Sequence, residues 1–143
     1  MARPLELGEL IETLREEHGE VKRRLAELKD AVERRWYAKA AELVSSLWDP
    51  LRQHVIDEEA KVLKAIIDAY GREGARDAIE IAQVHREIRS SIEELDKLAR
   101  RTPGMLGPEV AKLRKLLEDH FEAEENRMFP QALKAQREVL TRR

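Results

Sequence analysis

Apolar residues recur at steps of three and four along four separate stretches of the chain, and no other feature of the sequence constrains the fold as strongly. This spacing puts them on one narrow helical face, which is typical of helices that pack in a bundle. The first and third stripes are Ile11, Leu14, His18, Val21, Leu25, Leu28, Val32 and Ala78, Ile81, His85, Ile88, Ile92, Leu95, Ala99. The second and fourth are Leu43, Leu47, Leu51, His54, Glu58, Val62, Ala65, Ala69 and Val110, Leu113, Leu117, His120, Glu124, Met128. We therefore predict an all-α fold.

The breaks between the stripes predict an up-and-down antiparallel four-helix bundle. Glycine and proline mark loops at residues 71–74 and 102–108, whereas the boundary near residues 34–36 has neither. Asp49-Pro50 interrupts the second stretch, either as a kink or as a new start with Asp49 as N-cap. Pro130 ends or kinks the fourth helix, so we expect a four-helix domain over residues 1–130 and a C-terminal tail or short helix over residues 131–143.

An internal repeat relates the two halves of the chain. The segment that begins at His18 aligns with the one that begins at His85, and the segment at His54 aligns with that at His120, at offsets of 67 and 66 residues. The bundle is therefore predicted to consist of two related helical hairpins rather than a solenoid array.

Composition narrows the classes of protein. Net charge is −2, from 27 basic and 29 acidic residues. The chain thus lacks the basic excess that is typical of proteins that bind nucleic acid. No apolar run is long enough for a membrane span and the N-terminus has no signal-peptide pattern, so we expect a cytoplasmic protein. Cysteine is absent, which excludes disulfides and thiolate metal sites.

The chain has only four histidines, one in each predicted helix and all inside the apolar stripes. In an antiparallel hairpin, two residues lie at equal height when the turn falls midway between them. The midpoint of His18 and His54 is residue 36, that of His54 and His85 falls between 69 and 70, and that of His85 and His120 between 102 and 103. All three midpoints fall at or beside the expected turns, so we predict one mid-bundle layer of four imidazoles.

Two glutamates join this layer. Glu58 and Glu124 each follow a histidine by four residues, on the same helical face, at positions where Leu or Ile is expected. An unpaired carboxylate buried there would cost several kcal/mol or more. No Lys or Arg occupies the central stripe nearby, so a multivalent cation is the simplest partner.

Four imidazoles and two carboxylates exceed the ligand set of one tetrahedral zinc ion and suit a pair of metal ions. Mixed nitrogen and oxygen ligands point to two iron ions first, with zinc, manganese or cobalt as substitutes. The imidazoles could be oriented by Glu17, Glu59 and Glu125, which are expected on the solvated face rather than as ligands, or by Gln53 and Gln83.

The order His, His-x-x-x-Glu, His, His-x-x-x-Glu on four successive helices resembles the hemerythrin-like (HHE cation-binding) family, from about Leu7 to Pro130. The resemblance implies a non-haem di-iron centre in a four-helix bundle, which binds dioxygen or nitric oxide or senses iron and oxygen. Its terminal ligands would be His18, His54, His85 and His120, with Glu58 and Glu124 as bridging ligands.

Two departures from the oxygen-carrying members matter. Those members have a fifth histidine one turn from the third-helix ligand, whereas here the two positions one turn from His85 are Ile81 and Arg89. They also have the fourth-helix carboxylate five residues after its histidine, whereas here it follows by four. These departures favour redox chemistry or sensing over reversible oxygen carriage.

Two classes of function stay open. In the first, the protein binds, senses or processes dioxygen, nitric oxide or peroxide, and no separate substrate motif marks it as a dedicated enzyme. In the second, the metal only stabilises a structural or interaction bundle or signals iron status to a protein partner, which the sequence does not identify.

Overall fold

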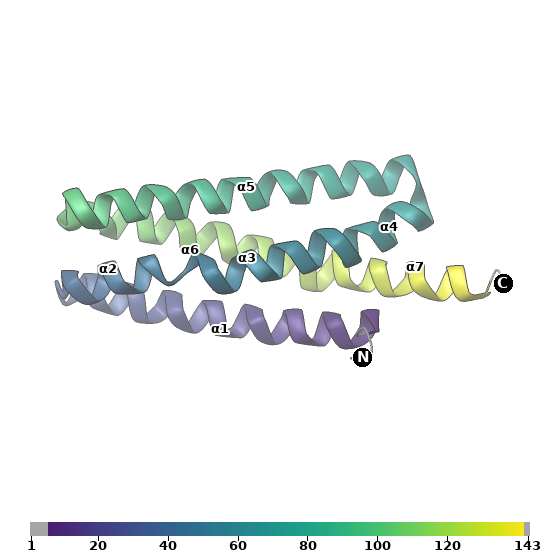
Figure 1. Ribbon diagram of the computed structural model, residues 1–143, viewed down its shortest axis with the longest axis horizontal. Coiled ribbons are helices and arrows are strands. Elements are labelled where there is room, and N and C mark those ends of the chain that lie inside the picture. Colours follow the sequence, from purple (N-terminus) through teal and green to yellow (C-terminus); the bar gives the residue numbers. More distant parts are fainter. Residues whose placement is uncertain (1–5, 142–143) are drawn as a thin grey trace.

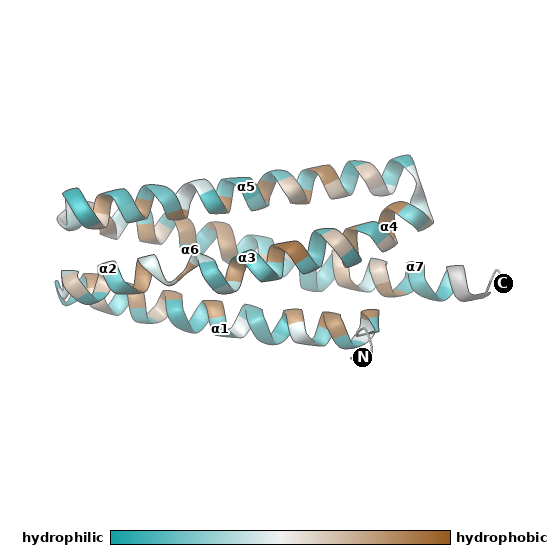
Figure 2. Ribbon diagram, viewed as in Figure 1, coloured by the Kyte–Doolittle hydropathy of each residue, from teal (hydrophilic) through white to brown (hydrophobic). Residues whose placement is uncertain are grey.

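The computed structural model describes residues 6–141, with side chains as far as residue 138, and confirms the all-α four-helix bundle. Four antiparallel rods lie side by side, and the start of the first and the end of the last are at the same end of the bundle (Figure 1). Hydrophilic and hydrophobic residues alternate along every rod, so none is apolar throughout (Figure 2). Among the described residues, no helix is long and apolar enough to cross a membrane.

The first and third rods are single α-helices, α1 (Leu7–Glu33) and α5 (Arg72–Arg101). The second rod is composite and contains α2 (Tyr37–Ser45), α3 (Trp48–Asp57), the π-helical turn η1 (Glu58–Val62) and α4 (Leu63–Tyr70). A short 3₁₀ turn, η2 (Pro103–Met105), leads into the fourth rod, which contains α6 (Leu106–Ala123), the π-helical turn η3 (Glu124–Met128) and α7 (Phe129–Thr141).

The first turn is a Schellman motif, which explains how α1 stops without glycine or proline. Arg35 adopts φ 59°. The Trp36 N–H donates to the Ala31 carbonyl at 2.9 Å and the Arg35 N–H to the Val32 carbonyl at 3.1 Å. These two bonds satisfy carbonyls that a helix end leaves free, and glycine is the usual residue at the left-handed position. Because this position holds arginine, the sequence lacks the glycine that would have marked the end of the helix.

The second rod starts anew near Pro50 rather than merely kinking. Helix α3 begins at Trp48, so Asp49 lies in its first turn and is not the N-cap, and Pro50 falls where backbone N–H groups have no intrahelical partner. A proline cannot donate to the carbonyl four residues before it, here that of Ser46. That carbonyl instead accepts from Arg24 Nη1 at 3.3 Å.

Two π-helical turns begin at the two stripe glutamates, Glu58 and Glu124. A π-turn inserts one extra residue and shifts everything after it by one position. The predicted stripe after Val62 is therefore wrong, because Leu63 and Ile66 are buried in place of Ala65 and Ala69. Pro130 does not end the fourth helix, which runs on through α7, so the domain boundary expected at residue 130 falls inside this rod.

The core consists of two apolar clusters with the histidine layer between them. The larger lies toward the first turn and contains Leu28, Leu95, Leu113 and Phe121. The smaller lies toward the α4–α5 turn and contains Leu14, Ile66 and Phe129, together with Ala132 from the segment after Pro130. This division puts the polar layer inside the bundle, flanked by packed hydrocarbon at both ends.

Candidate metal centre

The structure brings together all six side chains that the sequence predicts as metal ligands. One group contains His18, His54, Glu58 and Glu124, and the other contains Glu58, His85, His120 and Glu124; within each group the candidate ligand atoms lie within 4.8 Å of one another. None of the six is more than 7% exposed. Because Glu58 and Glu124 belong to both groups, the arrangement is that of two adjacent candidate cation sites that share two carboxylates.

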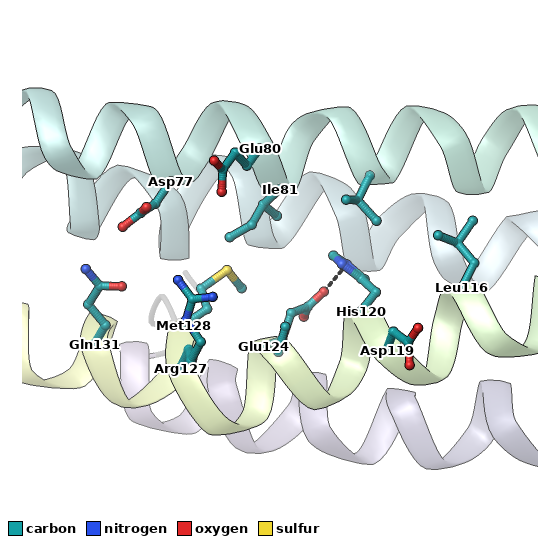
Figure 3. Close-up of a pocket in the computed structure, with 12 residues that line it drawn as sticks. Asp77, Glu80, Ile81, Leu116, Asp119, His120, Glu124, Arg127, Met128 and Gln131 are labelled. Atoms are coloured by element: carbon teal, nitrogen blue, oxygen red, sulfur yellow. Dashed lines mark ion pairs between the residues drawn. The ribbon is translucent and has the colours of Figure 1, made fainter.

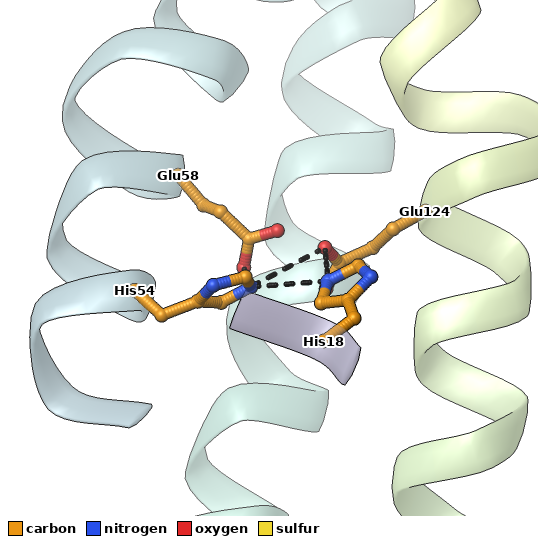
Figure 4. A group of neighbouring side chains, drawn as sticks. All are labelled: His18, His54, Glu58 and Glu124. Carbon is orange, nitrogen blue, oxygen red and sulfur yellow. Dashed lines mark hydrogen bonds and ion pairs between the residues drawn. The ribbon is translucent and has the colours of Figure 1, made fainter. Parts of the chain in front are cut away.

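The ring Nε2 atoms point toward the centre of this layer. Nε2 of His18 lies 3.2 Å from Nε2 of His54 and 3.2 Å from Oε2 of Glu124, as Figure 4 shows. Oε1 of Glu58 lies 3.3 Å from Nε2 of His54 and 3.1 Å from that of His85. Nε2 of His120 contacts Oε1 of Glu124. Each glutamate thus reaches imidazoles of both groups.

Carboxylates outside the layer contact the opposite ring nitrogens. His18 Nδ1 is 2.9 Å from Glu125 Oε1, and His54 Nδ1 is 3.2 Å from Glu17 Oε1. His85 Nδ1 is 3.6 Å from Glu59, which is beyond hydrogen-bond distance. A carboxylate at Nδ1 leaves Nε2 as the free acceptor, which is the tautomer a metal needs. Gln53 and Gln83 take no part, since both are exposed and Gln53 donates to Asp57.

Several buried atoms of the layer make no hydrogen bond within the described part of the chain. They are both carboxylate oxygens of Glu58, Oε1 of Glu124, both ring nitrogens of His85 and Nε2 of His120. Buried polar atoms are nearly always satisfied, and an unsatisfied charged group is the most expensive kind. A surplus of inward acceptors over donors fits a pair of divalent cations, so the residues fit the metals that the donor set implies.

Without metal, the layer is held together by proton sharing. Burial would raise the pKa of Glu58, but its contacts with His54 and His85 outweigh this and lower it to about 2. Burial would likewise lower the pKa of His54, yet Glu17 and Glu58 raise it to about 9. Burial lowers the pKa of His18 to about 4 and that of His120 to about 3. At neutral pH, Glu58 is therefore ionised, His54 carries a proton, and His18 and His120 are neutral.

Two phenylalanines fix the His18 ring. Phe121 stacks on it with ring centroids 3.9 Å apart and an interplanar angle of 15°, and Phe129 lies at 5.7 Å and 17°. Both phenylalanines are fully buried. Nothing in the spacing of these two residues along the sequence distinguishes an aromatic side chain that packs on a candidate ligand from one that packs on leucine.

A pocket of about 260 Å³ adjoins one side of the layer, between α5 and the fourth rod. His120 and Glu124 form its inner wall, and Ile81 and Met128 line it farther out (Figure 3). The sequence did not predict this pocket, because its walls come from two rods and the space between them depends on how the rods pack.

The sequence profile of the hemerythrin HHE cation-binding domain matches residues 9–132. Since the match spans most of the chain and the fold is the expected helical bundle, the chain belongs to the hemerythrin HHE cation-binding family. No curated protein sequence matches it significantly. No solved structure does so either. Family membership and the buried His/Glu cluster together support metal binding, while the role of each residue as a ligand stays a prediction.

Proposed function

We propose that this protein holds two iron ions in the mid-bundle layer and uses them to bind, sense or process dioxygen, nitric oxide or peroxide. The observation that carries the proposal is the sharing of Glu58 and Glu124 between two groups of candidate ligands. Two imidazoles on each side and two carboxylates in common suit a pair of ions at adjacent positions. The terminal ligands would be His18, His54, His85 and His120.

The donor set favours iron over other metals. Structural zinc prefers four closed tetrahedral ligands, whereas mixed imidazole and carboxylate sets with open positions are typical of non-haem iron. Iron, when bound, supplies the redox and small-ligand chemistry, and the chain supplies burial, orientation and charge. Zinc, manganese and cobalt have compatible ligand preferences and would occupy the same positions.

The residues around the layer favour sensing or redox chemistry over reversible carriage. The four histidines of the chain are all in the layer, so no fifth imidazole is available. Of the two positions that could have supplied one, Ile81 lines the pocket. Arg89 instead contacts Glu93 at 3.3 Å and lies 5.5 Å from the Trp48 ring. A centre with fewer protein ligands keeps open positions where a small molecule can react.

The proposal is tested by loading the metal-free protein anaerobically with ferrous iron and measuring metal per chain, followed by absorption spectra with air and with nitric oxide. We expect about two irons per chain and new visible absorption with each gas. The variant Glu94→Ala, on the exposed face of α5, should behave identically. One iron or none, with no spectral response, would contradict the proposal and favour a bundle whose metal only stabilises the fold or is read by a protein partner.

A further inference from the structure

The two halves of the metal centre are related by the internal repeat but differ at one position. His18 corresponds to His85, His54 to His120, Glu58 to Glu124 and Glu59 to Glu125. The residue before the first histidine is Glu17, and its counterpart before the third is Val84. Glu17 contacts Nδ1 of His54. The repeat would therefore place an equivalent carboxylate at position 84, against Nδ1 of His120, but the chain has valine at position 84.

This difference leaves the two pairs of histidines with unequal support. In the His18–His54 half, both Nδ1 atoms have a carboxylate at hydrogen-bond distance, at 2.9 and 3.2 Å. In the His85–His120 half, Glu59 stands 3.6 Å from His85, and within residues 6–138 no carboxylate contacts Nδ1 of His120. A carboxylate on the outer nitrogen makes a histidine a stronger ligand, and its loss typically weakens metal binding by about 10–100-fold.

The pocket lies beside the half that lacks this support. Val84 and His120 both line it, as do Ile81, Leu116 and Met128. A glutamate at position 84 would carry its carboxylate toward His120 and occupy part of this space. The valine therefore has two consequences at once: it removes a partner from His120, and it leaves room for a small molecule against that imidazole and Glu124.

We propose that the His85–His120 half is the weaker metal position and the one that a small uncharged ligand reaches through the pocket. This rests on the proposed function, since it assumes that both positions bind metal. Between the inner wall and the opening the lining is apolar, and the rim carries three carboxylates, Asp77, Glu80 and Asp119, against the single guanidinium of Arg127. A net negative rim disfavours anions, so the pocket suits an uncharged molecule a few atoms long.

The metal half of the proposal is tested by calorimetric titration of the full-length metal-free protein with Zn²⁺. We expect two steps, the second about 10–100-fold weaker than the first. Val84→Glu should strengthen the second step about tenfold, and Glu17→Val should weaken the first by a similar factor. Val84→Gln gives a neutral version in case the glutamate variant does not fold. Two equal steps that none of these variants changes would overturn the proposal but leave the proposed dinuclear site standing, whereas no binding at all would overturn both.

The access half is tested by the rate of nitric oxide binding to ferrous-loaded protein. Ala123→Phe introduces a ring into the pocket from the exposed end of α6 and should slow binding at least tenfold with two irons still bound. Val84→Phe does so from the α5 wall, and Ala111→Phe, exposed on α6 outside the pocket, is the matched control. Asp77→Asn combined with Glu80→Gln should speed azide binding and leave the nitric oxide rate unchanged. Unchanged nitric oxide rates in both pocket variants would overturn this route, and an unchanged azide rate would overturn the charge selection.

Discussion

Nδ1 of His18 lies 2.9 Å from Oε1 of Glu125, although the two residues are 107 positions apart in the chain. Glu125 directly follows Glu124, whose own carboxylate contacts the other ring nitrogen of His18 at 3.2 Å. Two consecutive residues at the start of a π-turn thus contact the two ring nitrogens of one imidazole. The contact explains how a residue predicted to lie on the solvated face helps to define the metal centre.

Replacing Glu125 by alanine should weaken metal binding about 10–100-fold, because the His18 ring loses the acceptor that orients it and strengthens it as a ligand. Helix content should not change. The measurement is competition for Zn²⁺ against a chelator of known affinity. Glu122→Ala, exposed on the same rod, is the control, and equal affinities of the two variants would rule out this role for Glu125.

Replacing Glu58 by alanine should lower metal content and remove the stabilisation that metal confers. Metal at a hundredfold excess over its Kd stabilises a protein by about 2.7 kcal/mol, or about 5–10 °C in Tm for a chain of this size. We expect this metal-dependent rise in Tm in the natural protein and in Glu94→Ala, and its loss in Glu58→Ala and His54→Ala. Full metal content in the last two variants would refute the ligand assignment.

Metal binding should release about one proton near pH 7. The pKa of His54 is raised from 6.5 to about 9 in the metal-free protein, so its imidazole must lose a proton to become a ligand. His18 and His120, whose pKa values are about 4 and 3, have none to lose. Release should therefore fall toward zero as the pH rises through 9. Calorimetry in buffers of different ionisation enthalpy measures it, and no release between pH 6 and 8 would contradict the proton-sharing arrangement.

Two glycine-to-alanine substitutions should have opposite effects on stability. At Gly74 an added Cβ would lie 2.5 Å from the backbone carbonyl oxygen of Ile66, so the α4–α5 hairpin would have to open, at a cost of about 1–3 kcal/mol. At Gly19, in the middle of α1, nothing lies within 4 Å, and alanine should stabilise by about 0.5–1 kcal/mol. Urea denaturation of the metal-free proteins compares them, and a neutral Gly74→Ala would show that the hairpin adjusts freely.

The sequence by itself determined the four helices, their antiparallel order and the composition of the polar layer. These follow from quantities that are local or additive along the chain: the helical period, the places of glycine and proline, and the equal distances of the histidines from the turns. Glu58 and Glu124 were recognisable because each breaks an apolar stripe one turn after a histidine.

Tertiary structure decided what depends on contacts between rods. The π-turns move the buried positions after Val62 by one residue, a shift that the helical period cannot predict because the extra residue is stabilised by the packing around it. The pairing of Glu125 with His18 and of Glu17 with His54 joins different rods. The pocket beside His120 lies between α5 and the fourth rod, and the effect of valine at position 84 depends on its place in the wall of that pocket.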